Sequence, residues 1–179
     1  MRIEPATLED LALLQWDVSE DERGSFARTF CREELRAAGP DFEIVQANLS
    51  TNAARHTLRG LHFQSPPHEE PKIVSCLAGR IWDVAVDLRE GSRTFRRWEA
   101  FELAPAERCA LFIPAGFAHG FLTLEPDSVV HYLMGAPFVA GAGRGIRWDD
   151  PALGIDWPAA PAVISERDRS FPPLGPSGT

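Results

Sequence analysis

Residues 72–88 read Lys72-Ile-Val-Ser-Cys-Leu-Ala-Gly-Arg-Ile-Trp-Asp-Val-Ala-Val-Asp-Leu88. Two apolar runs of strand length are separated here by Gly79 and Arg80, which predicts a tight hairpin turn between them. Strand-sized runs of this kind, bounded by turn residues, cover 42–49, 57–63, 72–77, 81–88, 94–103, 109–113, 118–124 and 128–134. About eight short strands at regular spacing predict an all-β sandwich or barrel, and a double-sheet jelly roll would protect its edges.

One segment favours a helix instead. Residues 31–39 contain good helix formers and close with Gly39, which Pro40 follows. Beyond Trp157 the chain is rich in Pro and Ala, so residues 158–179 are predicted to form an extended tail. A length of 179 residues suits one domain with a sizeable core and is too short for two ordinary ones. We therefore expect a single domain over residues 1–179.

The composition excludes several classes of partner. The formal net charge of -8 argues against nucleic acid or an anionic membrane as the main partner. No apolar run approaches the roughly 18–20 residues that span a bilayer, and the first residues do not resemble a signal peptide. Cys31, Cys76 and Cys109 are widely spaced, which indicates neither a disulfide framework nor a CxxC metal site. We expect a cytoplasmic protein.

Lysine and tyrosine occur once each, as Lys72 and Tyr132. Residue types that are otherwise absent can be retained for catalysis, and the alternative is that both occur by chance. His62 is a further candidate, three residues after Arg59. In a regular strand these two side chains would point to opposite faces. Gly60 lies between them, and a bulge at this glycine would let both reach one pocket. The alternative is that His62 is a core histidine satisfied by the backbone.

The pattern Pro114-x-Gly-x-x-His119 is similar to the second motif of the cupin superfamily, whose histidine binds a metal. The first cupin motif needs further ligands, where this chain has Phe63 and Gln64. Because a transition-metal site usually needs three or more ligands, we predict that no metal is bound. A metal-dependent cupin isomerase or dioxygenase is the alternative, with the ligands His62, His119 and Glu69 or Glu70.

Three blocks are specific when taken together: Leu58-Arg-Gly-Leu-His-Phe-Gln64, Asp83-Val-Ala-Val-Asp87 and Gly116-Phe-Ala-His-Gly-Phe121. In these blocks and their order the chain resembles the dTDP-4-dehydrorhamnose 3,5-epimerases of deoxysugar biosynthesis. The resemblance implies a cupin-type double-stranded jelly-roll β-barrel with short peripheral helices and a core at about residues 21–157. It also implies catalysis without metal or cofactor, and a homodimer in which residues 1–30 of one chain help complete the partner's site.

The resemblance also implies roles for individual residues. His62 corresponds to the catalytic base and Tyr132 to the proton donor. Asp168 corresponds to the carboxylate that orients the histidine, and Lys72 to the cation that stabilises the enolate. The positions that correspond to the shell around the sugar, diphosphate and nucleotide are Arg59, His119, Arg23, Gln46, Asn48, Phe138 and Arg167.

The chemistry of these residue types is consistent with that reaction. Inverting a carbon beside a ketone needs a base on one face, an acid on the other and a donor at the carbonyl oxygen. Histidine, with a pKa of about 6.5, can accept a proton at neutral pH, and tyrosine, with a pKa of about 10, can donate one. We predict an isomerase that epimerises a nucleotide-diphosphate-linked 4-keto-6-deoxy sugar at C3, C5 or both through an enolate.

Some positions depart from the family pattern. Arg28, Ala47 and Gly143 stand where acidic residues are usual, Leu133 where a lysine is common, and Phe138 where a tyrosine is usual. These positions belong to the nucleotide-binding shell and its neighbours, so the nucleotide and the inverted carbon stay open. A sugar-nucleotide-binding cupin without catalytic activity is the remaining alternative.

Overall fold

The computed structural model describes residues 1–39 and 42–175. Its strands are β1 (Arg2–Pro5), β2 (Ala12–Gln15), β3 (Val18–Asp21), β4 (Gly24–Ala27), β5 (Gln46–Asn52), β6 (Thr57–Gln64), β7 (Lys72–Ala78), β8 (Ile81–Asp87), β9 (Trp98–Leu103), β10 (Cys109–Ile113), β11 (Phe117–Thr123), β12 (Ser128–Met134), β13 (Gly143–Gly145) and β14 (Val163–Ile164). The helices are short: α1 (Arg32–Ala38), the 3-10 helix η1 (Pro105–Glu107) and α2 (Glu166–Arg169).

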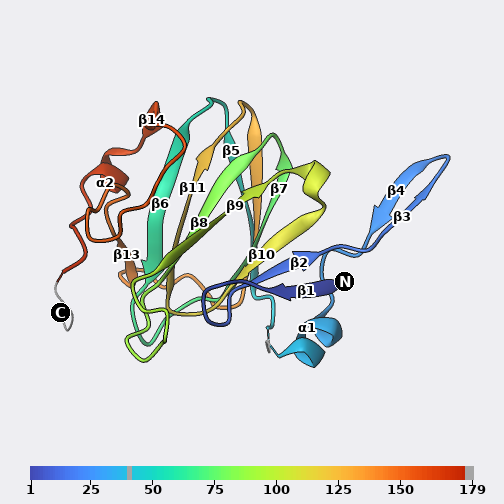
Figure 1. Ribbon diagram of the computed structural model, residues 1–179, viewed down its shortest axis with the longest axis horizontal. Coiled ribbons are helices and arrows are strands. Elements are labelled where there is room, and N and C mark those ends of the chain that lie inside the picture. The colour runs from blue at the N-terminus through green and yellow to red at the C-terminus, as the bar shows by residue number, and fades with distance from the viewer. Residues whose placement is uncertain (40–41, 176–179) are drawn as a thin grey trace.

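Two sheets form the body of the molecule (Figure 1). The first has the order β1-β2-β10-β7-β12-β5, and the second has the order β13-β6-β11-β8-β9 with β14 beside β6. Strands β3 and β4 pair only with each other, and their hairpin extends away from both sheets (Figure 1). The predicted all-β double-sheet jelly roll with short peripheral helices is confirmed.

Buried side chains from both sheets share one apolar core. Val74 and Val130 of the first sheet pack in the same cluster as Ala85 and Phe121 of the second. Each of these four side chains is almost completely removed from solvent, and burying apolar area is the main stabilising contribution to a fold of this kind. None of the described helices is both long and apolar enough to cross a membrane.

The turn at Gly79 and Arg80 corrects one prediction. Strand β7 lies between β10 and β12 in the first sheet, whereas β8 lies between β11 and β9 in the second. The two runs therefore do not form a hairpin, and the turn carries the chain from one sheet to the other. Gly79 has a φ of +70°, and a side chain there would overlap Ser128 of the neighbouring strand β12. A glycine is required because the crossing chain passes so close to that strand.

Two predicted strands have different bounds. The run at 42–49 becomes β5 at Gln46–Asn52, because Phe42 packs into the apolar cluster beside Leu35 of α1. The run at 94–103 shortens to β9, because the buried hydroxyl of Thr94 donates to Asp87 and holds the preceding residues in a turn. The helix predicted at 31–39 is confirmed as α1, while Pro40 lies outside the described residues.

Both ends of the chain differ from their predictions. Strands β1 and β2 extend the first sheet, so the sheet begins well before the predicted core boundary at residue 21. The segment predicted as an extended tail instead pairs β14 in parallel with β6 and then forms α2. Ser165 caps this helix, because its Oγ accepts the backbone N–H of Asp168 at 3.1 Å. The end of the predicted tail, residues 176–179, lies outside the described residues.

Candidate active site

A cavity of about 290 Å³ is lined by side chains from both sheets. Its lining residues are Asn48, Ser50, Arg59, His62, Glu70, Lys72, His119, Tyr132 and Met134. Strands β5, β7 and β12 of the first sheet contribute to it, and so do β6 and β11 of the second. Most of the predicted catalytic and substrate-binding residues are therefore brought together in one place.

A bulge in β6 places Arg59 and His62 in this cavity together. Strand β11 pairs His119 with His62 but Phe121 with Arg59, so β6 carries one extra residue between the two pairs. Gly60 occupies the irregular position with a φ of +139°, and a Cβ there would lie 2.6 Å from the Cα of Gly120. The predicted bulge is confirmed, and only a glycine fits where the two backbones approach this closely.

His62 forms a dyad with Asp168. The imidazole Nε2 lies 2.8 Å from Asp168 Oδ1, and the backbone N–H of Gly60 donates to Asp168 Oδ2 at 3.0 Å. The Asp168 side chain is 5% exposed, whereas that of His62 is 40% exposed. Burial alone would raise the pKa of Asp168, but the hydrogen bonds from His62 and Gly60 outweigh it and lower the pKa below its ordinary value. Asp168 therefore stays ionised and holds one nitrogen of an imidazole whose other side faces the cavity.

Phe171 adds a contact to His62 that the sequence did not reveal. The two rings meet edge to face with their centroids 5.7 Å apart. Gly145 makes room for this ring, since a Cβ on that residue would overlap Phe171. Gly145 is also the β13 residue paired with His62. No local pattern could have predicted this contact, because it depends on the tail returning across β13.

Tyr132 of the first sheet contacts His119 of the second sheet. Their rings meet edge to face at a centroid distance of 5.9 Å. His119 is buried, and its Nε2 contacts the buried carboxylate of Asp83 on β8. Burial raises the pKa of Tyr132 well above its ordinary value of 10.0, the charge of Asp83 adds to this, and Arg59 opposes it. The phenol is therefore held in its protonated form.

Lys72 lines the cavity from strand β7 of the first sheet, and its ammonium group is buried. Its Nζ donates to Glu70 Oε1 at 2.8 Å, and the Lys72 side chain is 5% exposed. From the sequence Glu70 was a candidate only as a metal ligand, and this ion pair was not predicted. A spacing of two residues in extended chain was the available signal, since such side chains point to the same face.

The described residues do not form the donor set of the metal-dependent alternative. His62 and His119 each direct Nε2 at a separate carboxylate, Asp168 and Asp83 respectively. Glu70 is paired with Lys72. Across residues 1–39 and 42–175, no group of three or more His, Cys, Asp or Glu side chains is arranged to hold a metal ion.

Arg59, which lines the cavity, is held in place by Asn52, whose Oδ1 accepts from the guanidinium Nε at 2.7 Å. Three other predicted binding residues, Gln46, Phe138 and Arg167, do not line the cavity. Gln46 accepts the backbone N–H of Phe138 at 2.6 Å, and the Phe138 ring is 68% exposed. Arg167 on α2 is exposed and lies over the Phe171 ring at 5.6 Å. Phe138 and Arg167 thus present an exposed aromatic ring and an exposed cation.

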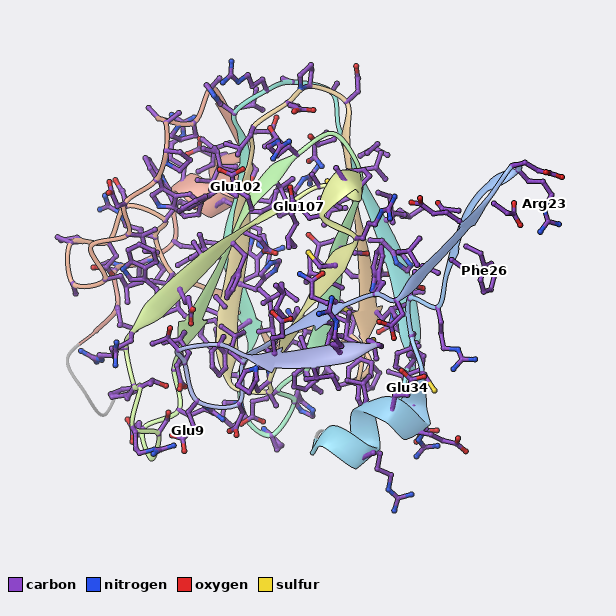
Figure 2. The ribbon with its side chains drawn as sticks, turned by 45° about the vertical axis from the view of Figure 1, so that its right-hand side comes forward. Glu9, Arg23, Phe26, Glu34, Glu102 and Glu107 are labelled. Carbon is purple, nitrogen blue, oxygen red and sulfur yellow. The ribbon has the colours of Figure 1, made fainter. Side chains whose placement is uncertain are left out.

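Arg23 is not brought to the site of its own chain. It lies at the tip of the β3–β4 hairpin, where its guanidinium pairs with Asp21. Figure 2 shows Arg23 and Phe26 projecting from this hairpin, away from the body of the molecule. Within a single chain Arg23 does not reach the cavity, because its hairpin makes no sheet pairing with the barrel. The assignment of Arg23 to a nucleotide-binding shell that a second chain completes stays a prediction.

Comparisons with known proteins identify relatives of this chain. The family model for dTDP-4-dehydrorhamnose 3,5-epimerase matches residues 5–175. A dTDP-4-dehydrorhamnose 3,5-epimerase of Sinorhizobium fredii is 42% identical over 175 residues, which cover 97% of this chain and 90% of that protein. The crystal structure of the Bacillus anthracis dTDP-4-dehydrorhamnose 3,5-epimerase with TDP and PPi bound superposes with a TM-score of 0.94 at 36% identity. That match covers 97% of this chain and 99% of the other.

A relative with a narrower activity is also similar. A 3'-monoepimerase from Streptomyces bikiniensis, in complex with dTDP-quinovose, matches with a TM-score of 0.88 at 32% identity. The alignment covers 95% of this chain and 86% of the other. These matches confirm the predicted cupin-type fold and the predicted isomerase class. The chain belongs to the dTDP-4-dehydrorhamnose 3,5-epimerase family.

Proposed function

We propose that this protein epimerises a nucleotide-diphosphate-linked 4-keto-6-deoxy sugar at C3, C5 or both, with His62 as base and Tyr132 as acid. One observation carries the proposal. His62 belongs to the second sheet and Tyr132 to the first, and both line one cavity together with the Lys72 ammonium group. A sugar ring between the sheets would meet a base on one face, an acid on the other and a cation at its edge.

The base works through the dyad. Asp168 holds one imidazole nitrogen, so the other nitrogen is free to accept the proton from the carbon beside the ketone. The ionised carboxylate then stabilises the imidazolium that forms. As this proton leaves, negative charge develops on the keto oxygen, and the N–H groups of Lys72 stabilise the resulting enolate.

The acid completes the inversion. Tyr132 stays protonated, because burial raises the pKa of its phenol. It can therefore deliver a proton to the face opposite His62, which converts the enolate into the inverted sugar. General acid–base catalysis supplies roughly 10²–10⁴-fold, so the remaining acceleration must come from Lys72 and from the groups that position the substrate.

We infer that the substrate is a nucleotide-linked sugar, because the protein offers cations and an exposed aromatic ring in and beyond the cavity. Arg59 lines the cavity with a guanidinium group already oriented by Asn52, and a planar guanidinium suits diphosphate oxygens. Phe138 offers an exposed ring on which a base could stack. The similar structures with TDP or dTDP-quinovose bound support this class of substrate.

The working protein is a homodimer in this proposal. The β3–β4 hairpin exposes Phe26, at 77%, on a segment that pairs with neither sheet. Strand β5 is the terminal strand of the first sheet and exposes Leu49 at 63%. Terminal strands are natural docking sites for another strand. A hairpin lying along the partner's β5 would bring Arg23 next to the partner's Gln46 and Asn48, and sedimentation should then give twice the mass of one chain.

The reaction is tested by NMR in D₂O with dTDP-, CDP-, GDP- and UDP-linked 4-keto-6-deoxy sugars. We expect deuterium to enter C3, C5 or both with at least one of these, before and after treatment with a chelator. His62→Ala should abolish the exchange, whereas Tyr132→Phe should keep some exchange and lose inversion. No exchange with any of the sugars would contradict the proposal. Exchange that a chelator abolishes and added metal restores would favour the metal-dependent alternative.

A further inference from the structure

The ammonium group that the proposed mechanism places at the keto oxygen is not free within its own chain. Lys72 and Glu70 form an ion pair with side chains only 5% and 14% exposed, and both line the cavity. A lysine has a flexible four-carbon stem and three N–H donors, so by itself it does not hold one position. The carboxylate engages one donor and leaves the others for a ligand.

Glu70 is itself held in place. Gln64, which is 3% exposed, donates its Nε2 to Glu70 Oε2 at 2.9 Å. The same Nε2 lies within 3.2 Å of the carbonyl oxygens of His68 and Pro137, and Gln64 Oε1 accepts the backbone N–H of Val139 at 2.8 Å. Because Gln64 is bound at both ends of its amide, it holds Glu70 in a single orientation.

The backbone between the two charged residues is also anchored. Pro71 separates them and has a restricted φ. Its carbonyl oxygen accepts the N–H of Gly135 at 2.8 Å, and Lys72 is paired with Met134 of β12. Glu70 and Lys72 therefore belong to a segment that is fixed against strand β12. Tyr132 lies on β12 two residues before Met134, so this segment cannot easily move relative to Tyr132.

We propose that Glu70 is a positioning residue, which holds the Lys72 ammonium group at the place where the enolate oxygen forms. The inference rests on the proposed function and adds a residue to its mechanism. Glu70 also compensates the charge of a buried ammonium group, which is costly to desolvate without a partner. It contributes no proton to the reaction and acts only through Lys72.

The test compares kcat and KM of Glu70→Ala with those of Glu69→Ala. Loss of the anchor should lower kcat by about 10–100-fold, as a small misplacement of a catalytic group does. KM should change little, because Arg59 and Phe138 are not touched by the substitution. Glu69→Ala is the matched control, because it removes the same charge from the same loop. Glu69 does not line the cavity and forms no ion pair within the described residues. An unchanged kcat in Glu70→Ala would overturn the inference.

A double-mutant cycle separates positioning from a structural effect. If Glu70 acts only through Lys72, adding Glu70→Ala to Lys72→Ala should cause no further loss of deuterium exchange. If Glu70→Ala lowers the rate of deuterium exchange as much in the Lys72→Ala variant as in the wild-type protein, the inference is overturned. Where Glu70→Ala fails to fold by circular dichroism, Glu70→Gln enters the same cycle, because it keeps the shape and removes the charge. Wild-type protein that exchanges no deuterium would instead contradict the proposed function itself.

Discussion

His62 and His119 lie directly opposite each other on the antiparallel strands β6 and β11, and each imidazole binds a different aspartate. Asp168 reaches His62 from the tail, whereas Asp83 reaches His119 from the neighbouring strand β8. The two histidines that resemble cupin metal ligands are thus parts of two separate pairs. In one pair the imidazole of His62 is partly exposed at the cavity and suited to proton transfer, while Asp168 is buried. The other pair is buried beside Tyr132.

The charge of Asp168 should matter to the rate. Asp168→Asn keeps the size of the side chain but can no longer hold an imidazolium, so we expect kcat to fall by about 10²–10⁴-fold. Asp156→Asn is the control, since Asp156 is exposed and does not line the cavity. Steady-state kinetics at neutral pH measures both, and equal kcat values for the two variants would contradict the dyad.

Asp168 should also stabilise the fold in a pH-dependent manner. Its pKa is lowered below the ordinary 3.8, so its contribution is fully present above that value and is lost as the pH falls through the lowered pKa. At pH 7 the Asp168→Asn variant should unfold with a free energy about 1–3 kcal/mol smaller than the wild type. Urea unfolding at decreasing pH measures this difference, which should narrow below pH 3.8; a constant difference would argue against it.

The only tyrosine of the chain makes its titration directly observable. Burial raises the pKa of Tyr132, so the folded protein should show no tyrosinate absorbance near pH 10, where the urea-unfolded protein titrates. For the same reason Tyr132 should contribute stability below pH 10 that is lost as the pH rises further. Ultraviolet difference spectra measure the titration, with Tyr132→Phe as the blank. A folded protein that titrates like the unfolded one would contradict the burial of the phenol.

Gly60 should tolerate no side chain. Gly60→Ala places a Cβ against the backbone of Gly120 at a φ of +139°, so we expect a loss of about 1–3 kcal/mol in unfolding free energy and a lower kcat. Gly91→Ala is the matched control, because a Cβ at Gly91 meets no atom within 4 Å. Urea unfolding and deuterium exchange test both variants. Equal behaviour of the two alanine variants would show that the bulge does not need glycine.

The proposed dimer predicts complementation between inactive chains. Arg23→Ala alters the β3–β4 hairpin that one chain contributes to the site of its partner. His62→Ala alters the site of the chain that carries the substitution. A mixed dimer keeps one intact site. That site contains His62 of the Arg23→Ala chain and the unaltered β3–β4 hairpin of the His62→Ala chain. Co-refolding equal amounts should therefore restore about a quarter of wild-type activity, since half of the dimers are mixed. If the activity of the mixture is no higher than the sum of the activities of the two variants measured alone, a hairpin that completes the partner's site is contradicted.

Much of the fold was predictable because strand formation is signalled locally. The apolar runs that became β6, β7, β8, β10, β11 and β12 have nearly the predicted bounds. The bulge at Gly60 was also predictable, since two side chains of interest stood on opposite faces of a strand with a glycine between them. The family resemblance brought His62, Tyr132 and Lys72 together before any contact was known, and the structure shows them in one cavity. The homodimer, the absence of a cofactor and the cytoplasmic location stay predictions.

Residue type and short spacing were enough to predict the central strands of the barrel, the candidate catalytic residues and the family resemblance, but not the strands β1–β4, β13 and β14. The three-dimensional packing was needed to show that the turn at Gly79 joins two sheets and that the tail returns to place Asp168 and Phe171 beside His62. It was also needed to show that the hairpin of Arg23 pairs with neither sheet. The contacts of Asp168 and Phe171 with His62 join segments more than 100 residues apart, as the 106-residue separation of His62 and Asp168 shows. The turn at Gly79 likewise depends on strands that are distant in the sequence. No local pattern of side chains encodes such a meeting, since it is selected by the packing of the whole barrel.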